Sequence, residues 1–113
     1  MKIIKNSITT DKLSEMAQNM FDILVKAVVD IEKEIMAIDA PMHSDEEAEL
    51  IKSGSKQENL WGINLYPAKY GEDFVEFDSM INLKPNQNNR SRGVDDPKIR
   101  QIIIQIVNGL VKK

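Results

Sequence analysis

The chain has 113 residues, of which 42% are hydrophobic and 29% charged, and its formal net charge at pH 7 is −3. This length predicts one domain over residues 1–113, and the lack of cysteine excludes disulfides and thiolate catalysis. The slightly acidic balance disfavours nucleic acid as a partner. No apolar run approaches the roughly 20 residues that cross a bilayer, and no signal peptide is recognisable. We therefore expect a cytoplasmic protein without a membrane partner.

The first predicted element is a helix that begins at Thr9 or Thr10, since either side chain can cap it. Its apolar residues recur at helical spacing and form one stripe, which predicts a face packed on a core. The stripe consists of Leu13, Met16, Ala17, Met20, Phe21 and Leu24.

The next segment, Val25–Ala40, fits two structures. Its β-branched residues favour a hairpin with Glu32-Lys33 as the turn and Glu34–Asp39 as the returning strand. That turn lacks the Asn-Gly or Asp-Gly sequence typical of two-residue hairpins. The competing interpretation continues the first helix, because apolar residues also recur there at heptad spacing. The β-branching favours the hairpin.

The rest of the chain carries clear boundary signals. Pro41 ends the preceding element, and Ser44–Glu47 has the composition of a capping box, which predicts a short helix to about Lys52 that ends at Gly54. Period-2 alternation over Leu60–Leu83, broken at Pro67–Asp73, predicts a second hairpin with Trp61 on its buried side. A polar loop follows, and Asp96-Pro97 begins the last helix.

These elements follow the order helix, hairpin, helix, hairpin, helix, which predicts an α+β fold. We expect a two-layer sandwich in which a four-stranded, mostly antiparallel sheet carries both long helices on one face, with one short helix besides. The other face of the sheet would then be open to solvent. On the hairpin interpretation, this open face would carry Lys26, Val28, Asp30, Glu34, Met36, Ile38, Asn64, Tyr66, Asp78 and Asn82.

Several stretches also carry a likeness to a known family. They are Val28–Ile31, Glu34–Ile38, Leu60–Asn64, Phe77–Asn82 and Asn89–Arg92, together with His43, Asp45, Glu47, Gly54, Ser55 and Gln57. Over roughly residues 24–110 the chain resembles a family of small bacterial and archaeal proteins catalogued as a domain of unknown function. The resemblance implies no activity, cofactor or catalytic residue, so the chemistry rests on the residues themselves.

Polar residues inside the predicted strands are the first candidates for a site. Asn and Asp are poor strand formers, so Asp30, Asn64, Asp78 and Asn82 indicate a surface whose donors and acceptors are used. The alternative is that they face water or bond to one another. Arg90 and Arg92 lie in the polar loop before the last helix, where they could bind an anion or simply pair with neighbouring carboxylates.

A metal site is the second candidate. Glu34, His43 and Asp45 could supply ligands for a divalent cation, with Asp30 and Asp78 as further oxygen donors. The spacing matches no known ligand signature, and acidic residues in the first turn of a helix are favoured by its dipole alone.

Three functional hypotheses follow. The first is a binding module for a small polar or anionic ligand on the open face, with Asp30, Asn64, Asp78 and Asn82 at its centre. The second is a homo-oligomer formed through Val28, Met36, Ile38 and Met80. The third is a metal-dependent hydrolase that uses Asp30, Glu34, His43 and Asp78. No cofactor is indicated by the sequence.

Overall fold

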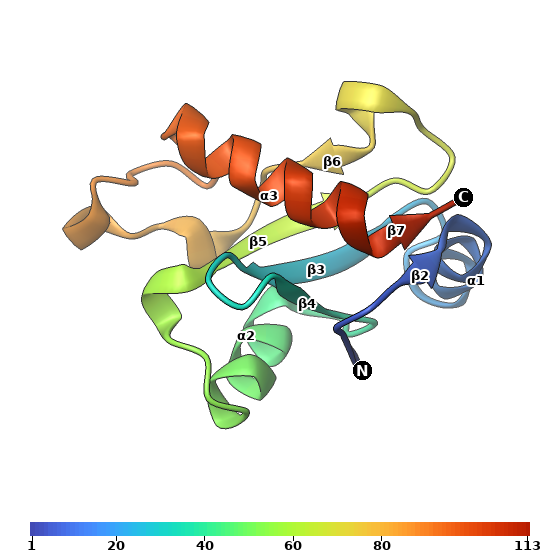
Figure 1. Ribbon diagram of the computed structural model, residues 1–113, viewed down its shortest axis with the longest axis horizontal. Helices are drawn as coiled ribbons and strands as arrows, with labels where there is room; N and C mark the ends of the chain where they lie inside the picture. The colour runs from blue at the N-terminus through green and yellow to red at the C-terminus, as the bar shows by residue number, and fades with distance from the viewer.

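The computed structural model describes residues 1–113 and is built around a five-stranded sheet (Figure 1). The strand order is β1 (Lys2–Ile4), β4 (Ile35–Ile38), β3 (Val25–Asp30), β5 (Leu60–Leu65) and β6 (Val75–Glu76), and all neighbours are antiparallel. A separate parallel pair joins β2 (Ile8–Thr9) to β7 (Val111–Lys112) near the two ends of the chain. The mixed fold and mostly antiparallel sheet were predicted, but the sheet has five strands where four were expected.

Three α-helices pack on this sheet: α1 (Thr10–Met20), α2 (His43–Lys52) and α3 (Pro97–Leu110). The expected boundary residues at three of their ends are confirmed. Thr9 accepts a hydrogen bond from the Lys12 amide, Asp96 accepts one from the Lys98 amide, and Gly54 follows α2 at φ +107°. None of the helices has the length and hydrophobicity needed to cross a bilayer.

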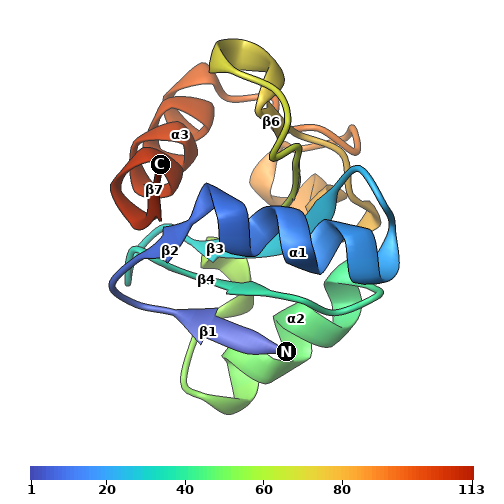
Figure 2. The same cartoon turned by 90° about the vertical axis from the view of Figure 1, so that its right-hand side faces the viewer.

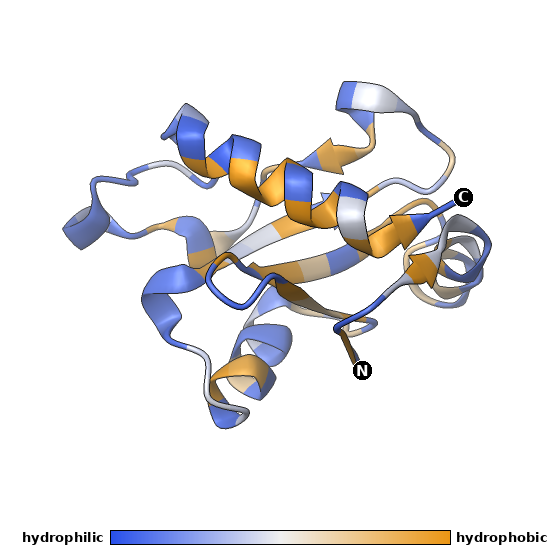
Figure 3. Cartoon of the chain, in the orientation of Figure 1, coloured by the Kyte–Doolittle hydropathy of each residue, from blue (hydrophilic) through white to orange (hydrophobic).

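The helices lie on both faces of the sheet. Figures 1 and 2 show α1 and α3 on one side and α2 on the other. The larger core has 18 buried residues, including Leu13, Met36, Trp61 and Ile103, and the apolar side of α3 faces it (Figure 3). On the other side, Leu50 of α2 packs with Val28, Ala37 and Leu60. The expectation of an open sheet face was therefore wrong.

The chain connectivity explains this second layer. β4 and β5 both pair with β3, on opposite edges of it. The segment between them must therefore cross β3, and α2 is that crossover. His43, Glu46 and Leu50 recur at helical spacing and are the buried residues of α2.

The first hairpin is confirmed over the interpretation as one long helix. Asp30 pairs with Ile35, so the turn comprises residues 31–34, two more than expected. Asp30 Oδ1 accepts the amides of Glu32 and Lys33, and Glu34 adopts φ +57°. Paired residues of antiparallel strands point the same way. Met36 and Ile38 therefore lie with Val29 and Ala27 in the larger core, which corrects their expected place beside Val28.

The second hairpin is much shorter than predicted. Only Val75 and Glu76 pair with β5, and a 3₁₀ turn follows at Met80–Asn82. This turn lies over Gly62, where a Cβ atom would come within 2.5 Å of both Ser79 Cβ and Ser79 Oγ. A glycine at position 62 thus leaves the space that the turn occupies.

Replacing Gly62 with alanine should lower the free energy of unfolding by about 1–3 kcal/mol, because the methyl group overlaps Ser79 in a packed interior. Urea denaturation checks this. Gly109→Ala is the matched control, since an added Cβ there meets nothing within 4 Å, and alanine favours a helix. Equal stability of the Gly62→Ala variant and the parent would contradict the close packing described.

Candidate functional site

A cavity of about 470 Å³ opens between the amino end of α2, the loop after α1 and the edge of the sheet at β6. It is lined by Phe21, Leu24, Lys26, Met42, His43, Ser44, Asn64, Glu76, Asp78, Ser79, Met80, Ile81 and Arg92. We call it the His43 cavity. It lies on the same side of the sheet as α2, which carries His43 into its wall.

Three neighbouring strands supply polar side chains to this cavity. Lys26 pairs with Asn64 and Asn64 pairs with Glu76, so the three side chains share one face. Asn64 Nδ2 donates to Glu76 Oε1 at 2.9 Å, and the Tyr66 hydroxyl donates to the same oxygen at 2.8 Å. This hydrogen bond to Glu76 is the main cause of the raised pKa of Tyr66. Glu76 thus orients both side chains through one of its two oxygens.

The amide oxygen of Asn64 has no such partner. The side chain is 7% exposed, and its Oδ1 is buried without any hydrogen bond in the protein. Leaving a buried acceptor unpaired costs about 1–3 kcal/mol. In a native protein such a group needs an explanation, and a ligand that supplies a donor is one. Because the oxygen is buried, a donor reaches it only if a side chain lining the cavity moves.

His43 is held in one tautomer. Its Nε2 lies 2.8 Å from the carbonyl oxygen of Ile63, so Nε2 carries the proton and donates it. Burial is the main cause of its lowered pKa, which keeps the ring neutral at pH 7. The Nδ1 lone pair makes no hydrogen bond within the protein and remains an acceptor on the cavity wall.

The amino end of α2 is uncapped. The helix begins at His43, one residue before the expected cap Ser44, and Met42 occupies the cap position, where its side chain accepts no hydrogen bond. The predicted capping box was therefore wrong. The backbone N–H groups of His43 and Ser44 have no acceptor in the protein, and both residues line the cavity.

An ion pair and exposed apolar side chains form the mouth. Arg92 Nε lies 2.7 Å from Asp78 Oδ1, and both side chains are about half exposed. Phe21, Met42 and Met80 are also exposed at the mouth. The formal charges of Lys26 and Arg92 balance those of Glu76 and Asp78, so the cavity combines an apolar rim with charges of both signs.

The sequence-predicted site residues separate into two groups. Asn64, Asp78, Arg92 and His43 all line the cavity. Asp30 ends β3 and accepts hydrogen bonds from the turn of the first hairpin, and Arg90 is exposed and bonds to Asp95 only through its backbone amide. No prediction from the sequence named Lys26, Glu76 or Phe21 as a site residue. Lys26, a charge within the otherwise apolar run Val25–Val29, was the available signal.

Asn82 has a different role from the one predicted. It is fully buried, its Oδ1 accepts the Gly62 amide at 2.8 Å, and its Nδ2 donates to the carbonyls of Gly62 and Arg92 at 2.9 Å each. Its amide group thus replaces a neighbouring strand at the edge of β5. All of its polar capacity is used inside the protein, so it belongs to the scaffold of the cavity.

The predicted metal ligands do not converge. Glu34 and Asp45 are exposed, while His43 is buried against Ile63. No group of three or more His, Asp or Glu side chains is arranged to hold a metal ion. The residues of the hydrolase hypothesis do not meet either, since Asp30 bonds the hairpin turn through Oδ1 and does not line the cavity that His43 and Asp78 line.

The predicted oligomer surface also changes. Val28, Met36 and Ile38 are completely buried within the monomer, so they cannot meet a partner. Met80 alone of that set is exposed, at the mouth of the His43 cavity.

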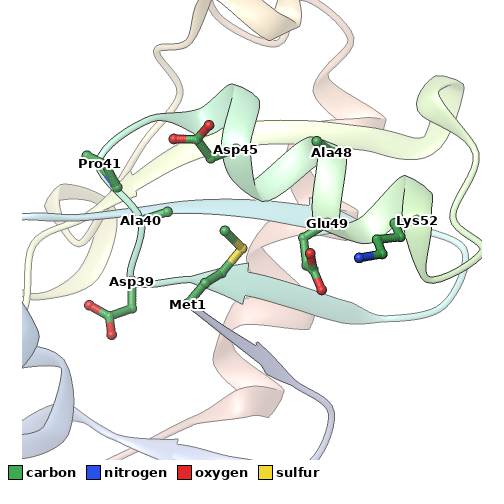
Figure 4. A pocket seen from close by; sticks show the side chains of 8 residues that line it. All are labelled: Met1, Asp39, Ala40, Pro41, Asp45, Ala48, Glu49 and Lys52. Carbon is green, nitrogen blue, oxygen red and sulfur yellow. The ribbon is translucent and has the colours of Figure 1, made fainter.

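Two other hollows are lined by no residue with a buried side-chain N or O atom that lacks a partner. One, of about 410 Å³, lies between Met1 and α2, and in Figure 4 its carboxylates at Asp39, Asp45 and Glu49 lie apart from one another. The other, of about 1000 Å³, runs along α3 beside the segment after β5. Its Arg100 already donates to the carbonyl oxygens of Val94 and Asp95. The His43 cavity is therefore the strongest candidate site.

Comparison with known proteins identifies a family but no activity. No curated protein and no solved structure matches the chain. A family model described as "Protein of unknown function (DUF5674)" matches residues 2–110. Because the match spans nearly the whole chain, the protein belongs to this family of unknown function.

Proposed function

We propose that this protein is a binding module that takes a small polar organic molecule into the His43 cavity. The observation that carries the proposal is Asn64 Oδ1, a buried acceptor without a partner in a cavity wall. Lys26 and His43 also line the cavity: Lys26 forms no ion pair and holds its ammonium 5.2 Å from the centre of the Phe21 ring, and His43 Nδ1 makes no hydrogen bond within the protein. An apolar cavity rim with a few convergent polar groups is typical of small-molecule sites, and the volume falls in their usual range of about 300–1,000 Å³.

The matching chemistry is a ligand with at least one N–H or O–H donor. Such a donor would satisfy Asn64 Oδ1, while an apolar part of the ligand would lie against Phe21, Met42 and Met80. Methionine side chains adapt their shape to a ligand because they are unbranched and flexible.

A panel of small polar metabolites, screened by ¹H–¹⁵N NMR, tests this proposal. We expect at least one compound to shift the amide signals of Lys26, His43 and Asn64, and we expect Asn64→Ala to weaken its binding by about tenfold or more. Asn86→Ala is the control, because Asn86 is exposed and makes no side-chain hydrogen bond. A panel without any compound that perturbs the cavity would contradict the proposal.

A further inference from the structure

We infer that the ligand of the His43 cavity is a zwitterion of the α-amino-acid type with an apolar side chain. This inference rests on the proposed function and adds the ligand class. Its basis is that the residues lining the cavity offer both donors and acceptors without partners in the protein.

The amino end of α2 offers the donors. The free backbone N–H groups of His43 and Ser44 lie at the positive end of a ten-residue helix, where carboxylates are favoured. Lys26 lines the same cavity and forms no ion pair with any carboxylate of the protein. Two acidic residues lie in the first turn. Burial raises the pKa of Glu46 to about 9 and keeps it uncharged at pH 7, and Asp45 is exposed and lines a different hollow. The free N–H groups and Lys26 suit a carboxylate.

The sheet edge offers the acceptors. Asn64 Oδ1 has no hydrogen-bond partner, and Asn64 is more than nine-tenths buried. This is evidence for a ligand that does not depend on the helix end. Glu76 and Asp78 each use only one carboxylate oxygen in hydrogen bonds within the protein. Three acceptors suit an ammonium group, which carries three N–H donors.

Neither half of such a ligand fits the cavity alone. A simple anion would meet the oxygens of Asn64, Glu76 and Asp78, and a simple amine would meet Lys26 and the positive helix end. A molecule that carries both charges complements a wall whose own charges balance. Its side chain would lie against the exposed Phe21, Met42 and Met80.

Titration of the intact protein with L-leucine and its two half-molecules tests the inference. Isopentylamine lacks the carboxylate of leucine, and 4-methylpentanoate lacks the amino group. We expect leucine to bind at least tenfold more tightly than either, by calorimetry and by NMR shifts at His43 and Asn64. L-methionine and L-phenylalanine extend the test to other apolar side chains.

Two variants assign the two ends of the ligand. We expect Lys26→Gln to weaken binding of leucine and 4-methylpentanoate by about tenfold and to leave isopentylamine unchanged or tighter. We expect Glu76→Gln to weaken binding of leucine and isopentylamine by about tenfold and to leave 4-methylpentanoate unchanged or tighter. Lys98→Gln, at an exposed position at the start of α3, controls for net charge. NMR signal dispersion confirms that each variant is folded.

The outcomes separate the two claims. If a half-molecule binds as tightly as leucine, or another polar compound binds at the cavity while no amino acid does, the ligand class is wrong and the proposed function stands. If neither these compounds nor the metabolite panel perturb the cavity, both fail.

Discussion

Replacing Asn82 with alanine should lower the free energy of unfolding by about 3–5 kcal/mol, the largest effect we expect from one truncation. The change leaves two buried backbone groups without partners, the amide and the carbonyl of Gly62, while the Arg92 carbonyl loses one of its two donors and keeps the Ser79 amide. Each unpaired group costs about 1–3 kcal/mol, although such costs do not add fully. Globular domains have only about 5–15 kcal/mol of stability, so the variant should be close to unfolding at 37 °C.

The same substitution should disturb the cavity. Asn89 donates to the Asn82 carbonyl at 2.7 Å and to the Gly93 carbonyl at 2.9 Å, and it accepts the Asp95 amide at 2.7 Å. These two asparagines therefore hold the chain between β6 and α3, which carries Arg92 to the cavity mouth.

Urea denaturation with fluorescence of Trp61 measures the loss. Asn86→Ala, at an exposed position without a side-chain hydrogen bond, should stay within about 0.5 kcal/mol of the parent. If Asn82→Ala were equally mild, the side chain of Asn82 would not be replacing a strand at the edge of β5.

The features that the sequence predicted correctly depend on residues close together in the chain. Thr9, Gly54 and Asp96 act on their own helix ends, so their residue types alone indicated the boundaries. The alternation of Leu60–Leu65 is confirmed, since Trp61 packs into the larger core as expected. The capping prediction was wrong at α2, because a methionine such as Met42 at the cap position gives no signal in the sequence.

What it missed depends on contacts between distant segments. Whether β5 pairs with β3 or β4 is not encoded in either strand, yet this choice sends α2 across the second face. Val75–Leu83 alternates like a strand, but Asn82 turns back onto Gly62, a contact across 20 residues. For the same reason Asn64 and Asn82 look alike in sequence. Asn82 uses all the hydrogen-bonding groups of its side chain, whereas Asn64 has an oxygen without a partner.

Glu46 should make the protein lose stability as pH rises, which is unusual for a carboxylate. The side chain is fully buried, its Oε2 accepts the Ala40 amide at 3.2 Å, and its Oε1 has no partner. Burial raises its pKa from 4.5 to about 9. Between these values the folded state keeps a proton that the unfolded state has released, so folding becomes less favourable by up to about 1.4 kcal/mol per pH unit.

Two other groups with shifted pKa values also make the stability depend on pH. The pKa of His43 is lowered below 6.5 in the folded protein. Its effect on the free energy of unfolding is therefore constant above pH 6.5, and stability is lost as the pH falls below 6.5. Burial lowers the pKa of Lys84 from 10.5, which opposes the trend of Glu46 at alkaline pH. Both shifts are also present in a Glu46 variant, so a comparison at each pH isolates Glu46.

Glu46→Gln keeps an acceptor for the Ala40 amide and removes the titration. We expect the stability advantage of the variant over the parent, measured by urea denaturation, to grow by about 3 kcal/mol between pH 5 and pH 7.5. A comparison below pH 4.5, where Glu46 is protonated in both the folded and the unfolded state, isolates the cost of burying the glutamine amide. Glu72→Gln, at an exposed position that is not among the causes of the Glu46 shift, should leave the slope of the parent unchanged. Parallel pH profiles for the parent and Glu46→Gln would mean that Glu46 is ionised in the fold, and its charge would then oppose a carboxylate bound at the amino end of α2.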